Sequence, residues 1–301
     1  MSVNHINSNP YLIIMRDIII LDCAEVQCPQ VLMFVFVELC QAFKDRNYNV
    51  QIIRNINDIS NNSIVFMGDT FRCPDIVSLL HSIAPDAIYI GWYWHNIKTD
   101  ALKYFIYTYE NMQKPDGRVT FLREQLHNCP LLLRASEHPD LVDTYTKNII
   151  YDYCYMGWGY CMELIPGESF HGIYHGVYNH DYFVPYDKRR EIYLSSMFAL
   201  GFQSSTNIDF EHVSQRIFEG LAYGCIVLSN SLPACEQTNN IVVHVTTKED
   251  LENKMLFFKA NPDIIKRKQE EGYEFIKKYG TNHYAIDTFI NCIKQNFDIV
   301  I

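Results

Sequence analysis

The chain has 301 residues, of which 48% are hydrophobic, and it carries 25 Lys and Arg against 35 Asp and Glu, a formal net charge of −10. The apolar share excludes wholesale disorder, and the length suggests two domains. Because phosphate backbones require a basic footprint, the acidic balance predicts that nucleic acid is not a partner. Any phosphate group that this chain binds must therefore be held by a few local residues.

The ten cysteines include no C-x-x-C pair and form no cluster with zinc-ligand spacing. Several, such as Cys40 and Cys225, lie in apolar runs, which predicts buried free thiols and a reducing compartment. The N-terminal stretch carries Arg16 and Asp17 and makes a poor signal peptide. The longest apolar stretch, at 31–43, is too short to span a bilayer. We therefore expect a cytoplasmic protein without a transmembrane segment.

Apolar runs alternate with helical patterns in the first half of the chain. We expect strands at 11–22, 49–53, 63–67, 86–92 and 131–135, and helices at 30–46, 74–83 and 100–111. Alternation of this kind, with runs that are apolar on both faces, is typical of α/β domains with parallel sheets.

A second series of the same kind begins at residue 148. Its expected strands are IIYDYCYMG, FHGIYHGVY, MFALGFQ, CIVLSN and NIVVHV, and its expected helices lie at 187–195, 212–223, 248–260, 262–279 and 282–295. A boundary near 180 would leave too few units for an independent second domain. We therefore predict a first domain at 1–147, a second at 148–281, and a closing helix at 282–301.

The most informative segment is DFEHVSQRIFEGLAYGCIVLSN, at 209–230. It predicts a loop, a helix, a tight turn at Gly224 and a buried strand. The start of such a helix is an anion site, because its N–H groups and its dipole favour negative charge. Ser214 lies in the predicted first turn, with Glu211 or Asp209 as the capping residue.

Two charged residues follow on this helix. Arg216, in the first turn, would add a bidentate phosphate contact. Glu219, three residues on, offers a carboxylate that suits the two hydroxyl donors of a ribose. The alternative is an ordinary surface pair between Arg216 and Glu219, on a helix whose core face is formed by Phe218, Leu221 and Ala222. The residues alone leave both interpretations open.

This segment resembles the donor-binding signature of GT-B-fold glycosyltransferases. Glu211 and Glu219 match the E-x7-E spacing of the retaining glycosyltransferase family 4, in which the first Glu contacts the transferred sugar and the second the nucleotide ribose. The stretch VSQRIFEGLAYGCIVL is also similar to the R-x-F-E-A-L-A-x-G-C pattern of spore-maturation glycosyltransferase-like proteins, to the inverting fucosyltransferases and to the exostosin-like enzymes. The resemblance implies two facing Rossmann-like domains with parallel sheets and an interdomain cleft.

The resemblance has further implications. It implies a donor-side loop at Gly157 and Gly159, close to the diphosphate, with a plain turn as the alternative. It also implies that the last helix crosses back onto the N-terminal domain. Two departures stand out. The glycine-rich loop expected after the first strand is replaced by ILDCAEVQCPQ, and E-G-F-G reads EHVS from Glu211, so Asp209 is an alternative sugar contact.

Candidate acceptor-side residues follow predicted strands of the first domain. GWYWHN, at 91–96, ends a strand where open α/β sheets place ligands. Its aromatic residues could stack on a sugar, and His95 could act as a base. The alternative is an aromatic core stripe with a satisfied histidine. Asp69 is a similar candidate, and RASEH, at 134–138, also ends a strand and is a candidate for the cleft. His171 and His175 share a strand face, but no third ligand is evident. The resemblance implies that helix dipoles and basic side chains neutralise the leaving diphosphate without a bound metal, so we predict none.

The resemblance implies a metal-independent glycosyltransferase. It would use a nucleotide-sugar donor, no further cofactor, and a hydroxyl of a glycan or another acceptor. If Glu211 acts as in family 4, the reaction retains the anomeric configuration; an inverting reaction would need a base, with His95 and Asp69 as candidates. The alternatives are a catalytically silent binding or scaffold protein and a nucleotide-sugar epimerase of the same fold. The sequence argues against a dehydrogenase, because no strand is followed by G-x-G-x-x-G.

Overall fold

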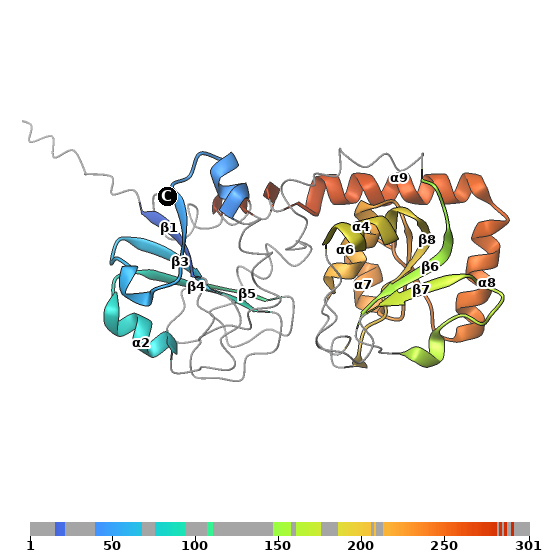
Figure 1. Cartoon of the computed structure of the whole chain (residues 1–301), viewed down its shortest axis with the longest axis horizontal. Coiled ribbons are helices and arrows are strands. Elements are labelled where there is room, and N and C mark those ends of the chain that lie inside the picture. Colours follow the sequence, from blue (N-terminus) through green and yellow to red (C-terminus); the bar gives the residue numbers. More distant parts are fainter. Residues whose placement is uncertain are drawn as a thin grey trace, which may run out of the picture.

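The computed structural model describes residues 16–21, 40–67, 76–93, 107–110, 147–157, 161–175, 186–205, 208, 213–281, 283–284, 286–287 and 290–291. Within these residues the chain forms two five-stranded sheets, in which every pair of neighbouring strands is parallel. The two sheets lie side by side along the longest axis of the molecule (Figure 1).

The first sheet has the strand order β2-β1-β3-β4-β5. Its elements are β1 (Asp17–Leu21), β2 (Val50–Ile53), β3 (Ser63–Met67), α2 (Ile76–Ile83), β4 (Ile88–Tyr93) and β5 (Tyr107–Glu110). The central strand β1 is apolar along its length because it is covered on both faces. Its Ile18, Ile19, Ile20 and Leu21 side chains are at most 1% exposed.

The predicted strands at 49–53, 63–67 and 86–92 are confirmed. The helix predicted at 100–111 is wrong at its end, because Tyr107–Glu110 forms β5. The sequence YTYE combines aromatic and β-branched residues that favour a strand, and β5 pairs in parallel with the edge of β4. The strand predicted at 131–135 lies outside the described residues.

The second sheet has the order β10-β9-β8-β6-β7. Its strands are β6 (Tyr151–Met156), β7 (Gly172–His175), β8 (Ser196–Leu200), β9 (Ile226–Ser229) and β10 (Val243–His244). Its helices are α4 (Tyr186–Leu194), α6 (Gln215–Ala222), α7 (Leu232–Gln237), α8 (Lys248–Lys259) and α9 (Pro262–Tyr279). When the strands of each sheet are counted in chain order, both sheets have the order 2-1-3-4-5, which is a doubly wound arrangement.

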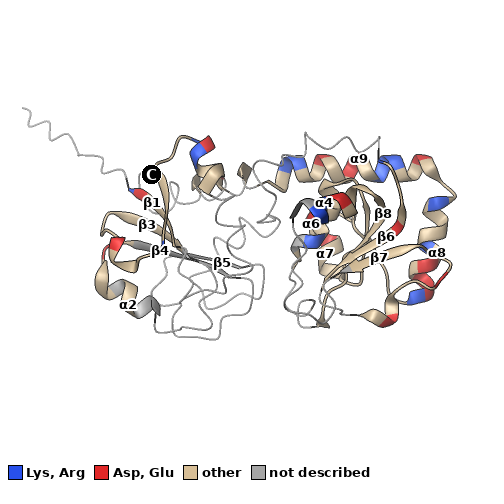
Figure 2. Ribbon diagram, in the orientation of Figure 1, with Lys and Arg blue, Asp and Glu red and all other residues tan. Residues whose placement is uncertain are grey.

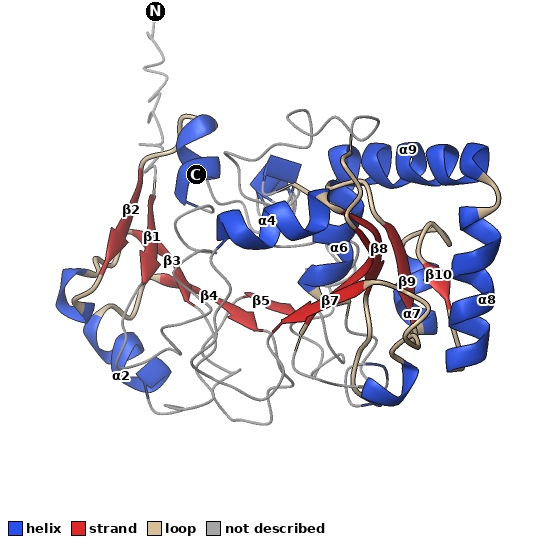
Figure 3. Ribbon diagram, turned by 45° about the vertical axis from the view of Figure 1, so that its right-hand side comes forward, coloured by secondary structure: helices blue, strands red, loops and turns tan. Residues whose placement is uncertain are grey.

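The two faces of the second sheet carry separate cores. On one face, α4, α6 and α9 pack against β8 and β9, with Ile217 of α6 and Ile276 of α9 fully buried (Figure 3). On the other face, Leu251 and Met255 of α8 pack against Tyr155 and its neighbours. Phe218, Leu221 and Ala222 are buried, which confirms that they form the core face of α6.

The fit of α6 onto the sheet depends on two glycines. Gly224 has φ 67, its N–H donates to the Leu221 carbonyl, and the N–H of Cys225 donates to the Gly220 carbonyl at 2.8 Å. This is a Schellman ending, and it confirms the predicted tight turn. At Gly220 a Cβ would lie 2.8 Å from Val227 Cγ2, so the helix can approach the sheet this closely only without a side chain.

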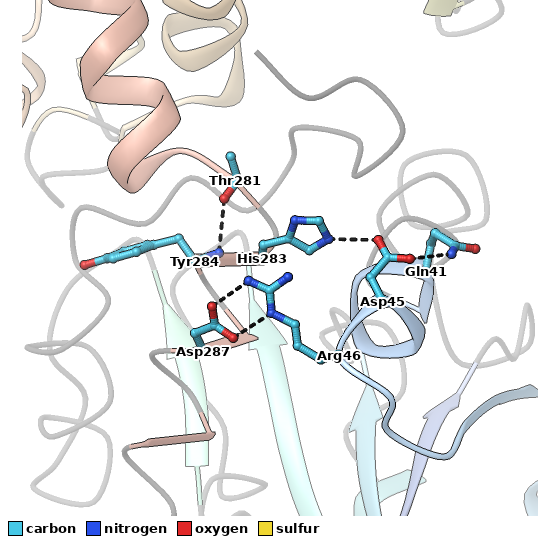
Figure 4. Close-up of polar contacts among 7 residues, drawn as sticks. All are labelled: Gln41, Asp45, Arg46, Thr281, His283, Tyr284 and Asp287. Carbon is cyan, nitrogen blue, oxygen red and sulfur yellow. Dashed lines mark hydrogen bonds and ion pairs between the residues drawn. The ribbon is translucent and has the colours of Figure 1, made fainter. Parts of the chain in front are cut away.

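Residues that follow α9 contact the first half of the chain (Figure 4). Arg46 makes two hydrogen bonds to the Asp287 carboxylate, at 2.7 and 2.6 Å. His283 Nε2 lies 2.8 Å from Asp45 Oδ2, and Gln41 also donates to that carboxylate at 2.8 Å. These contacts join His283 and Asp287 to Asp45 and Arg46, at the end of the helical residues 40–45.

Two expectations concern the chain as a whole. The five cysteines that the structure describes are all free, and four of them, including Cys40 and Cys225, are buried. Across the described ranges, no helix has both the length and the apolar character needed to cross a membrane.

Candidate functional site

One edge of the second sheet brings three elements together. β6 ends at Met156, β8 ends at Leu200, and α6, which follows β8 in the chain, begins at Gln215. The strand order reverses between β6 and β8, because β7 lies beyond β6 while β9 lies beyond β8. Open α/β sheets bind ligands outside the carboxyl ends of their strands at such a switch point. This edge is therefore the candidate site.

Arg216 occupies the switch point. Its Nη1 donates to the Phe202 carbonyl oxygen at 3.0 Å, and its guanidinium carbon lies 5.7 Å from the centre of the Tyr155 ring. A Cβ at Gly157 would overlap the guanidinium, so the backbone after β6 passes directly beside it. The cation thus lies between the segments that follow β6 and β8, held by a carbonyl and an aromatic face.

Ser214 is the N-cap residue of α6. Its backbone is extended, as a cap requires, yet its side chain makes no capping hydrogen bond. The hydroxyl is buried, and it has no hydrogen-bond partner among the described residues. The prediction that this helix begins at 212 and is capped by Glu211 or Asp209 is therefore wrong: Ser214 is the N-cap, α6 begins at Gln215, and the side chain of Val213 packs into the core.

Gln203 was not singled out by the sequence. Its side chain is 1% exposed, and neither its amide oxygen nor its amide nitrogen has a partner within the described residues. Its backbone is fixed by the Asn230 side chain, which accepts from the Gln203 N–H at 2.8 Å and donates to its carbonyl at 2.9 Å. Only its place at the end of the run MFALGFQ hinted at a site, because that is where a parallel strand ends.

Glu219 lies deeper than the sequence suggested. Its side chain is buried, and Oε1 lies 3.1 Å from Nη2 of Arg189 on α4. Burial, followed by the nearby Glu219 carboxylate, raises the pKa of Tyr193 well above its ordinary value. The surface-pair alternative for Glu219 is therefore wrong, because the carboxylate is enclosed between α4 and α6. Figure 2 marks the Lys and Arg residues of α4 and α6 at the end of the second sheet nearest the first.

Several predicted site residues lie outside the described residues. These are Glu211, Gly159, His95 and Asp69. The strands expected before the last two are confirmed: β3 ends at Met67 and β4 ends at Tyr93, and the two strands pair in parallel.

Within the described ranges, no group of three or more His, Cys, Asp and Glu residues is placed to hold a metal ion. His171 is exposed, and its Nδ1 lies 3.1 Å from the Ile150 carbonyl oxygen. The side chain of His175 lies outside the described residues.

Comparison with known proteins places this geometry in context. The sequence model of a family described as glycosyl transferase-like matches residues 157–291. No curated protein matches the chain. Among solved structures, the chain is similar to an α-glucosyltransferase in complex with UDP and a 13-mer DNA containing an HMU base, with a TM-score of 0.55 and 10% identity over 93% of this chain and 100% of that one. The chain has the GT-B fold.

The predicted fold class, α/β with parallel sheets and GT-B, is thus confirmed. The family match covers the segment that holds Gly157, Gln203, Ser214, Arg216 and Glu219. The specific likeness to family 4 or to spore-maturation proteins stays a prediction. The DNA in the similar structure gives no support to the expectation that nucleic acid is not a partner.

Proposed function

We propose that this protein is a glycosyltransferase that moves a sugar from a nucleotide-sugar donor to an acceptor hydroxyl. The observation that carries the proposal is the position of the Arg216 guanidinium, at the switch point of a parallel sheet and in the first turn of α6. The glycosyl transferase-like match over the same segment supports it.

The site has the groups that donor cleavage requires. When the bond from the sugar to the diphosphate breaks, negative charge develops on the phosphate oxygens. The N–H groups at the start of α6, the Ser214 hydroxyl and Arg216 would stabilise that charge, because all of them are hydrogen-bond donors. Arg216 donates from Nη1 to the Phe202 carbonyl oxygen, and its guanidinium has further N–H groups that can donate to phosphate. These groups supply the positive charge, so we propose metal-independent transfer without a further cofactor.

Glu219 is proposed to accept hydrogen bonds from the donor ribose. Its ion pair with Arg189 favours the ionised carboxylate, which is the form that accepts from two hydroxyls. Gly157 and Gly159 are proposed to lie close to the diphosphate. At Gly157 the absence of a side chain leaves room for the guanidinium.

The stereochemical outcome is proposed to be retention, with Glu211 or Asp209 near the transferred sugar. Inversion would instead require a base beside the acceptor hydroxyl, and His95 and Asp69 are the candidates. Nuclear magnetic resonance of the first product, before mutarotation, separates the two outcomes. An inverted anomer would exclude the family 4 mechanism and direct mutagenesis to His95 and Asp69.

A thermal-shift screen tests the proposal. UDP-, GDP-, CMP- and dTDP-sugars are added to the wild-type chain, to Arg216→Met and to Arg267→Met, a control at an arginine on α9 whose side chain is 66% exposed. A donor at one hundred times its Kd should raise the melting temperature by about 5 °C. We expect one nucleotide class to stabilise the wild type and Arg267→Met, but not Arg216→Met. Stabilisation by none of the four would refute the proposal.

The same samples separate the alternative functions. Transfer releases the nucleoside diphosphate and glycosylates an added acceptor, an epimerase changes the configuration of the donor sugar, and a silent scaffold leaves the donor intact. Simple glycosides and DNA with a hydroxymethylated base should both be offered as acceptors. The net charge of −10 favours the glycosides, because it repels a polyanion.

A further inference from the structure

We propose that Gln203 is a donor-recognition residue, whose side-chain amide donates to a diphosphate oxygen and accepts from a hydroxyl of a sugar joined to that diphosphate. The inference rests on the proposed function, because it concerns the same ligand. Gln203 lies outside the segment 209–230, which carries the resemblance to glycosyltransferases. The inference assigns one partner to the nitrogen of its side-chain amide and another to the oxygen.

The register of the chain places the amide beside the start of α6. Phe202 belongs to the core on the α8 face of the sheet, together with Phe198 and Leu200, whereas Ala199 belongs to the core on the α6 face. Side chains alternate between the faces along extended backbone. We infer that Gln203 continues this alternation. Its backbone N–H and carbonyl both form hydrogen bonds to the Asn230 side chain, as they would to a neighbouring strand. Its side chain therefore projects to the α6 face, at the edge where α6 begins.

Two buried polar groups at this edge have no hydrogen-bond partner within the described residues. The Gln203 amide and the Ser214 hydroxyl are each more than nine-tenths buried, and neither has a hydrogen-bond partner within the described residues. A buried amide without partners destabilises a fold, and a methionine of similar length would fill the same space without that penalty. A polar ligand at the α6 N-terminus supplies the missing partners.

The chemistry of an amide narrows the class of ligand. Its nitrogen carries two donors, and its oxygen only accepts. An ionised diphosphate can satisfy the nitrogen but has no donor for the oxygen. The oxygen is satisfied when the diphosphate carries a sugar whose hydroxyl lies next to it, and a nucleotide sugar has two such sugars, the ribose and the transferred sugar.

Titration calorimetry on Gln203→Met tests the inference. The probes are inorganic pyrophosphate and three pairs of nucleotide and nucleotide sugar: UDP with UDP-glucose, GDP with GDP-mannose, and dTDP with dTDP-glucose. We expect Gln203→Met to bind the best donor about tenfold more weakly than the wild type, while its melting temperature stays the same or rises. Gln203→Glu, which keeps the acceptor but loses the donors and adds charge, should lose more affinity.

Gln269→Met is the matched control. Gln269 lies on α9, and its Nε2 donates to the Gly224 carbonyl at 2.8 Å, at the opposite edge of the sheet. The Gln269 amide therefore already has a hydrogen-bond partner, and it lies away from the α6 N-terminus. Its replacement should therefore lower the melting temperature and leave donor affinity unchanged, which is the reverse of the Gln203→Met result.

The probes also identify the sugar. A loss that is larger for the nucleotide than for pyrophosphate assigns the hydroxyl to the ribose. A loss that is larger for the nucleotide sugar than for the nucleotide assigns it to the transferred sugar. Wild-type affinity in both Gln203 variants would overturn the inference and leave the proposed function standing. If the wild type itself binds none of the seven probes, this inference fails, and the proposed function fails with it unless a CMP-sugar stabilises the chain in the thermal-shift screen.

Discussion

Arg216 and Glu219 lie three residues apart on α6 and meet different surroundings. The guanidinium reaches the strand ends, whereas the carboxylate is buried against Arg189 of α4. The sequence marked both residues, because their spacing matches a known signature. It did not mark Arg189 or Gln203, because only the folded chain brings Arg189 of α4 to Glu219 of α6 and buries the Gln203 amide.

The ion pair decides how Glu219 should be tested. Glu219→Ala removes the carboxylate that lies 3.1 Å from Arg189 Nη2 in a largely buried place, so we expect the free energy of unfolding to fall by about 3 kcal/mol. The double variant Glu219→Leu with Arg189→Met should recover most of that loss, because it removes both charges. Urea unfolding at neutral pH measures both. If Glu219→Ala were as stable as the wild type, the Arg189–Glu219 ion pair would contribute nothing to the free energy of unfolding.

Gly157 offers a test of the Arg216 position. A Cβ in Gly157→Ala would overlap the guanidinium and displace it from the Phe202 carbonyl. We expect donor affinity to fall about tenfold, the size of one charge-assisted hydrogen bond. Gly167→Ala is the control, because a Cβ there lies no nearer than 3.5 Å to Glu252. Calorimetry on both variants checks the prediction, and equal affinities would contradict it.

At the scale of elements, α6 is fitted to the sheet along its length. Gly220→Ala should raise helix propensity by about 1 kcal/mol, yet the new methyl group would lie 2.8 Å from Val227 and 2.9 Å from Ala199. Overpacking of this kind costs about 1 to 3 kcal/mol, so we expect a net loss of stability. Chemical denaturation measures the sign. A more stable variant would show that the helix can shift away from the sheet without cost.

Most strands and the longest helix were predictable from the sequence, whereas α7 and β5 were not. The strand at 63–67 and the helix at 262–279 have the predicted bounds. α7 was missed because its six residues are too few to show a helical period, although Ser231 caps it through the Ala234 N–H. β5 was predicted as helix because it lies at the end of the helical pattern at 100–111. Its residues YTYE favour a strand, but the strand they pair with, β4, lies earlier in the chain.

At the scale of the whole molecule, the contacts near Asp45 should respond to pH. Hydrogen bonds from Gln41 and then from His283 lower the pKa of Asp45. A carboxylate whose pKa is lowered by folding stabilises the fold above its ordinary pKa of about 4 and loses that contribution as the pH falls through the lowered value. We expect the difference in melting temperature between the wild type and Asp45→Asn to shrink from pH 6 towards pH 2.5. A difference that stays constant would contradict this.

The contacts between 283–287 and Asp45 and Arg46 also set an order of events during synthesis. Each sheet is built from strands that are close in sequence, so each half can fold as it leaves the ribosome. Arg46 and Asp287 are 241 residues apart. At ordinary translation rates, roughly 10 to 50 s pass between the two. The first half is therefore made well before the residues at 283–287 that contact Asp45 and Arg46. In nascent chains stalled before residue 283, we expect the first half to be more sensitive to protease than in the completed chain.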